Sequence, residues 1–330
     1  MWDYVVIFAV SLLVTFVFTK YWASTMLRRG IVGVDVHKQS QPKIPEMCGA
    51  GIVVGVVMSA ATAAVIHQEI FREIASFVSV ILLAALVGAY DDLKGLNPRL
   101  KPVLLAGCAI PLLIFGIYDP RPVVPVIGSA PVSLRLFLVY PVLIFFATAI
   151  PANAVNMMDV LNGSMSGTCS ISVLSLCISS IILASSLGLI LSLCMLGALF
   201  AFFYYNKYPA RVFAGDIGDL SVGAGIGAMA VIGRLEVVTI VALMPQIMNA
   251  FYNLFSVGRI FAHEELKERP TKLMPDGRLA ATGARNAAVT LTRIILARGP
   301  LKEKEIVTVF LALSAFSAFL SVVTSLILMR

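Results

Sequence analysis

The chain has 330 residues, of which 59% are hydrophobic and 13% charged, and its mean hydropathy is +0.94. This composition excludes an ordinary water-soluble globular protein, because there is too little polar surface to face water on every side. The formal net charge is +7, and the five cysteines have no C-x-x-C spacing, so neither a metal cluster nor a disulfide framework is indicated. The chain is therefore expected to be solvated largely by lipid.

Ten apolar runs are long enough to cross a membrane as helices. They cover residues 4–22, 49–66, 74–90, 102–118, 137–155, 168–185, 187–205, 220–233, 236–257 and 306–329. No cleavage-site pattern follows the first run, which is therefore interpreted as a membrane helix. The sequence predicts an all-α integral membrane protein of about ten transmembrane helices, with residues 1–330 forming a single polytopic domain.

The basic residues predict the orientation of these helices. If the N-terminus faces outward, 20 of the 25 Lys and Arg residues fall on the inner side. Such a bias places the inner loops in the cytoplasm. It also explains the positive net charge as a topology signal with some attraction for anionic lipid, without nucleic acid as a partner.

Two connections have recognisable character. Residues 118–136 alternate prolines with β-branched residues, which predicts a short extracytoplasmic hairpin. Residues 258–304 form the longest inner connection and are predicted to be a cytoplasmic loop. Within it, residues 287–297 form an amphipathic segment expected to lie along the membrane surface as an interfacial helix.

Acids and amides gather at the predicted cytoplasmic helix ends. They are Asp91 and Asp92 in AYDDLKGL, Asn156, Asp159 and Asn162 in NAVNMMDVLNG, and Asp216 and Asp219 in FAGDIGDL. Each carboxylate alone is consistent with a solvated helix cap, but charges near hydrocarbon are costly, so the set indicates a functional site. Oxygen ligands without a His or Cys cluster favour Mg²⁺, with Mn²⁺ as the alternative, and a phosphate-bearing substrate.

Five segments, in order, resemble the polyprenyl-phosphate N-acetylhexosamine-1-phosphate transferases. They are KIPEMCGAGIVVG, YDDLKGLNPRLK, NAVNMMDVLNG, RVFAGDIGD and MPQIMNAFYNLF. The likeness runs from about residue 30 to 280 and is greatest to the branch that uses UDP-N-acetylglucosamine and dolichyl phosphate.

The resemblance implies that a lipid phosphate attacks the β-phosphorus of a UDP-sugar and releases UMP, as the first step of lipid-linked oligosaccharide synthesis for N-glycosylation. It implies an active site on the cytoplasmic face of a plasma membrane or endoplasmic reticulum. A homodimer is considered as the assembly.

The resemblance also implies catalytic roles. Asn156 and Asp216 would bind the metal with the pyrophosphate, and Lys101 would contact phosphate. Asp91 and Asp92 match an aspartate pair proposed to handle the acceptor's proton or the metal. Because the second pKa of a phosphate monoester is about 6, the lipid phosphate is mostly ionised near neutral pH, and electrostatic organisation is favoured over base catalysis.

Donor recognition follows from the same match. Phe213 would stack on uracil, Asn162 would hydrogen-bond to it, and Glu46 would line the nucleotide pocket. The dolichol branch has an Arg and His cluster before a proline; this chain has LKERP there, so Lys267 or Arg269 would contact the sugar.

Other readings are weaker. Asp159 matches an aspartate of the bacterial members, but the single His263 disfavours the muramyl-peptide branch, which has a histidine-rich loop there. The D-x-x-D-G-x-x-A-R signature of CDP-alcohol phosphotransferases is absent from the sequence. The main alternative is a polytopic transporter with a cytoplasm-facing acidic ion site; acids at helix ends, without an internal repeat, favour the enzyme.

Overall fold

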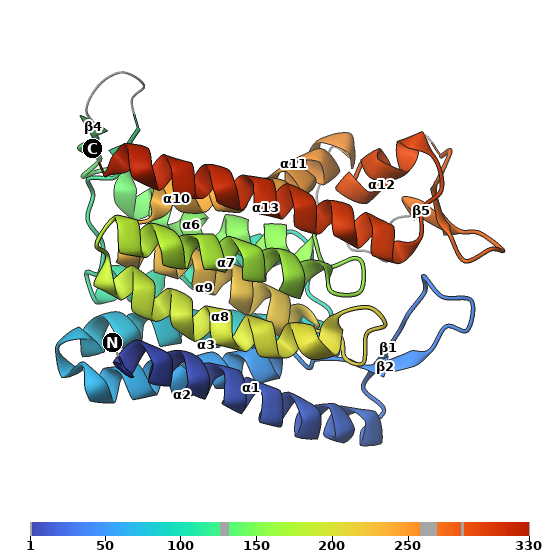
Figure 1. Ribbon diagram of the computed structural model, residues 1–330, viewed down its shortest axis with the longest axis horizontal. Helices are drawn as coiled ribbons and strands as arrows, with labels where there is room; N and C mark the ends of the chain where they lie inside the picture. Colours follow the sequence, from blue (N-terminus) through green and yellow to red (C-terminus); the bar gives the residue numbers. More distant parts are fainter. Residues whose placement is uncertain (1, 126–131, 258–268, 285–286, 330) are drawn as a thin grey trace.

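The computed structural model describes residues 2–125, 132–257, 269–284 and 287–329. Most of these residues form helices that run side by side along the long axis of the molecule (Figure 1). The first part of the chain contains α1 (Trp2–Arg28), β1 (Val32–Val34), β2 (Lys43–Pro45), α2 (Ala50–Ile66), the 3-10 helix η1 (Gln68–Ile70), α3 (Phe71–Lys94), α4 (Leu100–Gly107), α5 (Ile110–Ile114), β3 (Val123–Val124) and β4 (Val132–Ser133).

The remainder of the chain completes the helical body. It contains α6 (Tyr140–Asn156), α7 (Ser164–Ile182), α8 (Ser186–Asn206), α9 (Asp216–Gly233), α10 (Glu236–Ala242), α11 (Met244–Val257), β5 (Thr271–Leu273), β6 (Leu279–Ala281), α12 (Leu291–Ile295), the 3-10 helix η3 (Leu296–Arg298) and α13 (Glu303–Leu328). The fold is mostly helical, as predicted.

Membrane-spanning candidates agree with the hydropathy pattern. Among the described residues, six helices are long and apolar enough to cross a membrane, and the pair α10–α11 makes a seventh candidate if it counts as one bent span. Three shorter apolar helical segments, Ala50–Ile66, Leu100–Ile114 and Tyr140–Asn156, coincide with the remaining predicted runs. The surface between the helix ends is apolar; Leu13, Leu86 and Phe319 are 59%, 68% and 63% exposed, as expected for side chains that face lipid.

Two of the predicted spans are broken. α10 and α11 meet at an angle of 69°. Pro245 lies in the first turn of α11; it lacks the backbone N–H that would continue the α10 hydrogen-bond ladder, and its ring clashes with a preceding carbonyl. The predicted run 102–118 likewise divides into α4 and α5, with Pro111 in the first turn of α5.

Helix α9 lies at the centre of the bundle. In its most hydrophobic stretch 89% of the residues are buried, against 22% for α1. Its most extensive packing is against α3 and α6. Close approach is possible because glycines face the neighbours: a Cβ on Gly227 would lie 1.8 Å from the Ala147 carbonyl oxygen of α6, and one on Gly223 would lie 2.4 Å from that of Pro151.

Helix α7 packs against α8 and α13 through small polar residues. Its serines are buried, and Ser170 and Ser180 donate hydrogen bonds to the carbonyls of Ser166 and Leu176, four residues earlier. These bonds satisfy both hydroxyls within the helix, which lowers the cost of burying them in an apolar bundle; Ser172 donates instead to the Ala242 carbonyl, and the Ser179 hydroxyl has no partner among the described atoms. The five cysteines are free and buried, as expected for small hydrophobes.

The two ends of the bundle differ. Both termini and the β3–β4 pair lie at one end, and β1, β2, β5 and α12 lie at the other (Figure 1). In the predicted hairpin, Val123 pairs with Ser133 in antiparallel register. The interfacial helix predicted over 287–297 is shorter than expected: helix begins at Leu291, because Thr290 is extended and its side chain accepts a hydrogen bond from the Arg293 backbone N–H at 3.2 Å.

Gly227→Ala tests the packing of α9. The added methyl group collides with backbone, which cannot rotate away, so we expect the free energy of unfolding to fall by about 3 kcal/mol. Thermal unfolding in detergent measures the effect. Gly107→Ala, where a Cβ meets nothing within 4 Å, is the matched control and should leave the melting temperature within about a degree or two of the parent. Equal melting temperatures for the two variants would contradict this packing.

Candidate active site

Lys101, in the first turn of α4, holds together side chains from three other helices. Its ammonium group donates to Asp91 Oδ2 of α3 at 2.8 Å and to Asp216 Oδ2 of α9 at 2.5 Å. It lies 3.4 Å from Asn156 Oδ1, at the end of α6. The ionic side chains are only 14% to 23% exposed, so their attraction is weakly screened.

Asn156 connects this group to a deeper carboxylate. Its Nδ2 donates to Asp216 Oδ1 at 2.5 Å and lies 3.4 Å from Asp219 Oδ2. Asp219 is 3% exposed, and its other oxygen, Oδ1, has no hydrogen-bond partner among the described atoms. Asp219 lies three residues after Asp216, and this i, i+3 spacing on a helix is the signal that could have placed both on one face; the sequence pattern placed Asp219 among the acids at helix ends but predicted no role for it in the site.

Asp92 has a different environment from its neighbour Asp91. Its two oxygens accept the backbone N–H groups of Asp216 and Ile217, at 2.8 and 3.0 Å, and so cap the N-terminus of α9. Gly215 precedes that helix with φ of +68°, and a Cβ there would lie 2.9 Å from Asp92 Oδ2. A glycine is therefore needed both for the backbone conformation and for the approach of the carboxylate.

Asp159 lies in the turn after α6, beneath the group around Lys101. Burial raises its pKa to about 6, although it accepts hydrogen bonds from the Met165 backbone N–H and the Ser164 hydroxyl. The negative charge of Asp216 contributes in the same direction.

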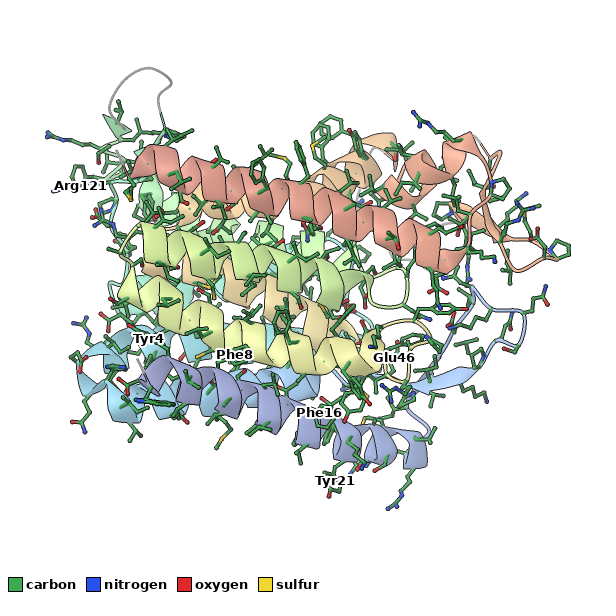
Figure 2. All side chains as sticks on the ribbon, viewed as in Figure 1. Tyr4, Phe8, Phe16, Tyr21, Glu46 and Arg121 are labelled. Atoms are coloured by element: carbon green, nitrogen blue, oxygen red, sulfur yellow. The ribbon has the colours of Figure 1, made fainter. Side chains whose placement is uncertain are left out.

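Glu46 and Phe213 lie beside one another, near the group around Lys101. The Phe213 backbone N–H donates to the Pro45 carbonyl at 2.9 Å, which ties the segment before α9 to β2. A Cβ on Gly33 would lie 2.9 Å from the Phe213 ring and 3.2 Å from the Glu46 carboxyl, so both side chains close over β1. Burial, and secondarily the charge of Asp216, raises the pKa of Glu46. Figure 2 shows Glu46 toward the end of the bundle that carries β1 and β2, with Arg121 at the opposite end.

Asn162 is placed apart from the Lys101 group. It is 4% exposed; its Nδ2 donates to Asp35 Oδ2 at 3.0 Å, and its backbone N–H donates to Glu303 Oε1 at 2.8 Å. Burial alone would raise the pKa of Asp35, but its hydrogen bonds with Lys38 and Asn162 outweigh this and lower it. The pairing of Asn162 with Asp35 and Glu303 joins segments more than 100 residues apart and could not be read from the sequence.

Of the two residues proposed to contact the sugar, the structure describes only Arg269. Lys267 lies outside the described residues. Arg269 is exposed, and it is close enough to His37 for its charge to act there: burial lowers the pKa of His37, and Arg269 adds to that lowering. Arg269 is therefore near His37, which lies in the segment between β1 and β2.

The polar group around Lys101 fits a divalent cation by its chemistry. Within the described chain no three Asp, Glu, His or Cys side chains form a ready metal-binding cluster, and Lys101 and Asn156 lie between the carboxylates. Oxygen atoms of Asp91, Asp216 and Asn156 already surround one positive centre, the Lys101 ammonium group. With the buried, unpartnered oxygen of Asp219, carboxylates outnumber this single cation, and oxygen donors of this kind suit Mg²⁺ or Mn²⁺.

Comparison with known proteins points to one family. Residues 74–234 match the model described as glycosyl transferase family 4, a region that includes Asp91, Lys101, Asn156 and Asp216. A putative glycosyltransferase of Methanocaldococcus jannaschii is 27% identical over 96% of this chain and 96% of that protein.

Two further relatives have more specific names. One from Saccharolobus solfataricus, named a putative UDP-N-acetylglucosamine–dolichyl-phosphate N-acetylglucosaminephosphotransferase, is 25% identical and covers 95% of this chain and 94% of its own. A probable undecaprenyl-phosphate N-acetylglucosaminyl 1-phosphate transferase of Bacillus subtilis is 27% identical and covers 84% and 78%.

The cap of α9 by Asp92 makes a stability prediction. Asp92→Ala removes the acceptor of two buried N–H groups, so we expect the free energy of unfolding to fall by about 1–2 kcal/mol, and Asp92→Asn, which keeps one acceptor oxygen, to lose less. Thermal unfolding in detergent measures both. Asp276→Ala, in an exposed turn, is the control for loss of an aspartate. An Asp92→Ala protein as stable as this control would refute the capping role.

Proposed function

Because the chain belongs to glycosyl transferase family 4, a family of polyprenyl-phosphate sugar-1-phosphate transferases, we propose that it transfers N-acetylglucosamine 1-phosphate from UDP-N-acetylglucosamine to dolichyl or polyprenyl phosphate. The archaeal relatives named for dolichyl phosphate support this lipid, and a related N-acetylhexosamine donor is the variant of the same proposal. The product would enter lipid-linked oligosaccharide synthesis for N-glycosylation.

One observation carries this proposal. A single ammonium group, Lys101, gathers Asp91, Asp216 and Asn156 from three helices at one end of an apolar bundle. An enzyme that joins a lipid phosphate to a water-soluble nucleotide sugar needs its charged groups at such a boundary, where the lipid headgroup and the donor can meet. Polar groups of this kind are expensive next to hydrocarbon, which supports a functional reason for keeping them there.

The proposed reaction is a displacement at phosphorus. An oxygen of the lipid phosphate forms a bond to the β-phosphorus of the UDP-sugar, and the bond from that phosphorus to the bridging oxygen breaks, so UMP leaves with the bridging oxygen. Since the acceptor is largely ionised near neutral pH, positioning and charge neutralisation contribute more than proton removal. Lys101 would contact the transferred phosphate. Asp91 would hold Lys101 in place, and Asp92 would hold the N-terminus of α9.

Mg²⁺, or Mn²⁺, would be held by Asp216 and Asn156. When bound, such an ion draws charge from the pyrophosphate oxygens and stabilises the leaving phosphate. The buried oxygen of Asp219 that lacks a partner is a further candidate ligand from this chain.

The donor's two ends would contact different segments. Phe213 would stack on the uracil, with Glu46 lining the nucleotide pocket beside it. Asn162 would hydrogen-bond to the base, and Arg269 or Lys267 would contact the sugar. Release of Asn162 from Asp35 would accompany base binding, because the side-chain N–H that reaches Asp35 is the donor available to a uracil carbonyl.

The membrane arrangement completes the proposal. The six long helices, the bent pair and the three shorter apolar segments would supply ten crossings, with the Lys101 end in the cytoplasm and the β3–β4 pair outside. The membrane would be a plasma membrane or endoplasmic reticulum, and the bias of Lys and Arg toward one set of loops supports this orientation.

The reaction can be tested with radiolabelled UDP-N-acetylglucosamine, dolichyl phosphate and Mg²⁺ added to detergent-purified protein. We expect label to enter the lipid phase together with UMP release, and chelation of the metal to abolish both. Asp216→Asn should reduce transfer at least about 100-fold by removing a ligand and its charge, whereas Asp276→Asn should not. If folded protein transfers label from no UDP-N-acetylhexosamine, the transferase proposal is rejected and the transporter becomes the favoured function.

Phe213→Ala tests the nucleotide pocket. Loss of a stacking surface costs about 1–3 kcal/mol per base, so the KM for the UDP-sugar should rise roughly 10-fold or more with a smaller change in kcat. Phe319→Ala, on the exposed face of α13, is the control. A change in kcat alone, without a rise in KM, would argue against a role in donor binding.

A further inference from the structure

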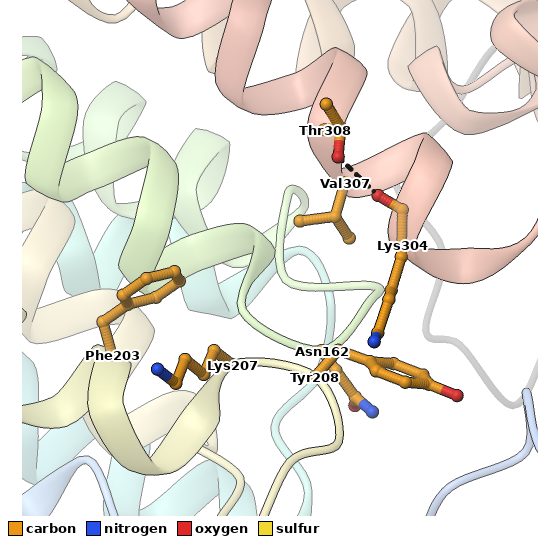
Figure 3. Close-up of a pocket in the computed structure, with 7 residues that line it drawn as sticks. All are labelled: Asn162, Phe203, Lys207, Tyr208, Lys304, Val307 and Thr308. Carbon is orange, nitrogen blue, oxygen red and sulfur yellow. Dashed lines mark hydrogen bonds between the residues drawn. The ribbon is translucent and has the colours of Figure 1, made fainter.

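A cavity separate from the Lys101 group opens between the end of α8 and the start of α13. It has a volume of about 200 Å³ and is lined by Phe203, Lys207, Tyr208, Lys304 and Val307, with Asn162 and Thr308 completing its wall (Figure 3). We refer to it as the α8–α13 cavity. It lies at the same end of the bundle as Lys101 but is built from α8 and α13 instead of α3, α4 and α9.

Two lysines line this cavity, and the carboxylates of Asp35 and Glu303 lie behind its wall, hydrogen-bonded to Asn162. Among the described residues, neither Lys207 nor Lys304 has a carboxylate oxygen within 4.0 Å. The Lys304 ammonium group extends toward the Tyr208 ring, 4.8 Å from its centroid (Figure 3), and the ammonium group of Lys38 lies at the same distance from that ring. Lys38 is paired with Asp35, so among the described residues Lys304 is the ammonium group at this ring that has no carboxylate oxygen within 4.0 Å. An anion beside Lys304 would therefore be favourable.

The remaining walls suit a lipid rather than a small ion. Phe203 and Val307 supply apolar surface next to the lysines. Deeper along the helices, Phe203 of α8 and Leu311 of α13 both contact Gly167 of α7, with a Cβ there meeting them at 3.0 and 2.8 Å. Basic residues at a helix end followed by apolar side chains along the helix match a phosphate headgroup followed by an acyl chain.

We propose that the α8–α13 cavity binds the headgroup of an anionic phospholipid whose phosphate is a diester, with Lys207 and Lys304 as its counter-charges. Such a lipid has no terminal phosphate to donate as an acceptor, so this site is distinct from the proposed acceptor site at Lys101. Asn162 belongs both to the cavity wall and to the hydrogen bonds with Asp35 and Glu303. Because Asn162 is also the residue proposed to contact the donor base, the cavity adjoins the proposed donor site through this residue.

The test is lipid retention by the full chain in detergent, measured by native mass spectrometry with phosphatidylglycerol and with neutral phosphatidylcholine. Wild-type protein should retain one phosphatidylglycerol in preference to phosphatidylcholine. The double variant Lys207→Gln/Lys304→Gln should bind phosphatidylglycerol at least about tenfold more weakly, because each basic residue near a lipid headgroup contributes about 1 kcal/mol. The readout does not depend on transfer activity, so it can fail or succeed independently of the proposed reaction.

The matched control is Lys20→Gln/Arg28→Gln, which removes two exposed positive charges from the C-terminal part of α1. It should retain phosphatidylglycerol as the parent does, and the melting temperature of each variant reports that it is folded. Equal retention by the Lys207→Gln/Lys304→Gln variant and the parent would overturn the proposal. So would displacement of phosphatidylglycerol by inorganic phosphate, which would make the cavity a free-anion site, or equally tight competition by polyprenyl phosphate, which would make it part of the acceptor site.

Discussion

The ion-pair group around Lys101 is the interaction on which the site depends. Two opposite unit charges 4 Å apart are worth about 1 kcal/mol in bulk water but about 4 kcal/mol near a protein surface. The carboxylates of Asp91 and Asp216 come from helices that are separate in sequence, and each would repel the other without the ammonium group between them. Lys101 therefore joins the ends of α3, α4 and α9 through its two ion pairs.

Close packing of the helices makes that arrangement possible. A Cβ on Gly88 of α3 would lie 2.3 Å from the Asp216 carbonyl oxygen, so the start of α9 rests against α3 directly below Asp91 and Asp92. Asp92 then reaches the first N–H groups of α9 and offsets the partial positive charge of that helix end. Without the small residues the carboxylates would be held too far apart to share one cation.

The α8–α13 cavity extends this logic to the other side of the bundle. There, among the described residues, Lys207 and Lys304 have no carboxylate oxygen within 4.0 Å, and Phe203 and Val307 add apolar surface to the polar lining. Asn162 links the two regions, because the turn that carries it begins at the end of α6, where Asn156 contacts Lys101. One end of the bundle thus presents one group suited to a metal and a pyrophosphate and another suited to a lipid headgroup.

The sequence by itself determined the class of the protein, the approximate limits of the helices and the family that the chain resembles. These follow from properties that are local in the chain: apolar runs of about 20 residues and short motifs such as AGDIGD. The grouping of Asp91, Lys101, Asn156 and Asp216 was also expected, since all lie at predicted helix ends on one side.

Only the tertiary structure decided what each side chain contacts. Asp91 and Asp92 are adjacent in sequence, yet one pairs with Lys101 and the other caps α9, because successive residues on a helix point about 100° apart and meet different neighbours. The bend before α11 and the pairing of Asn162 with Asp35 and Glu303 likewise depend on packing between distant segments. Such contacts carry no local signal, because they arise only when the helices are brought together.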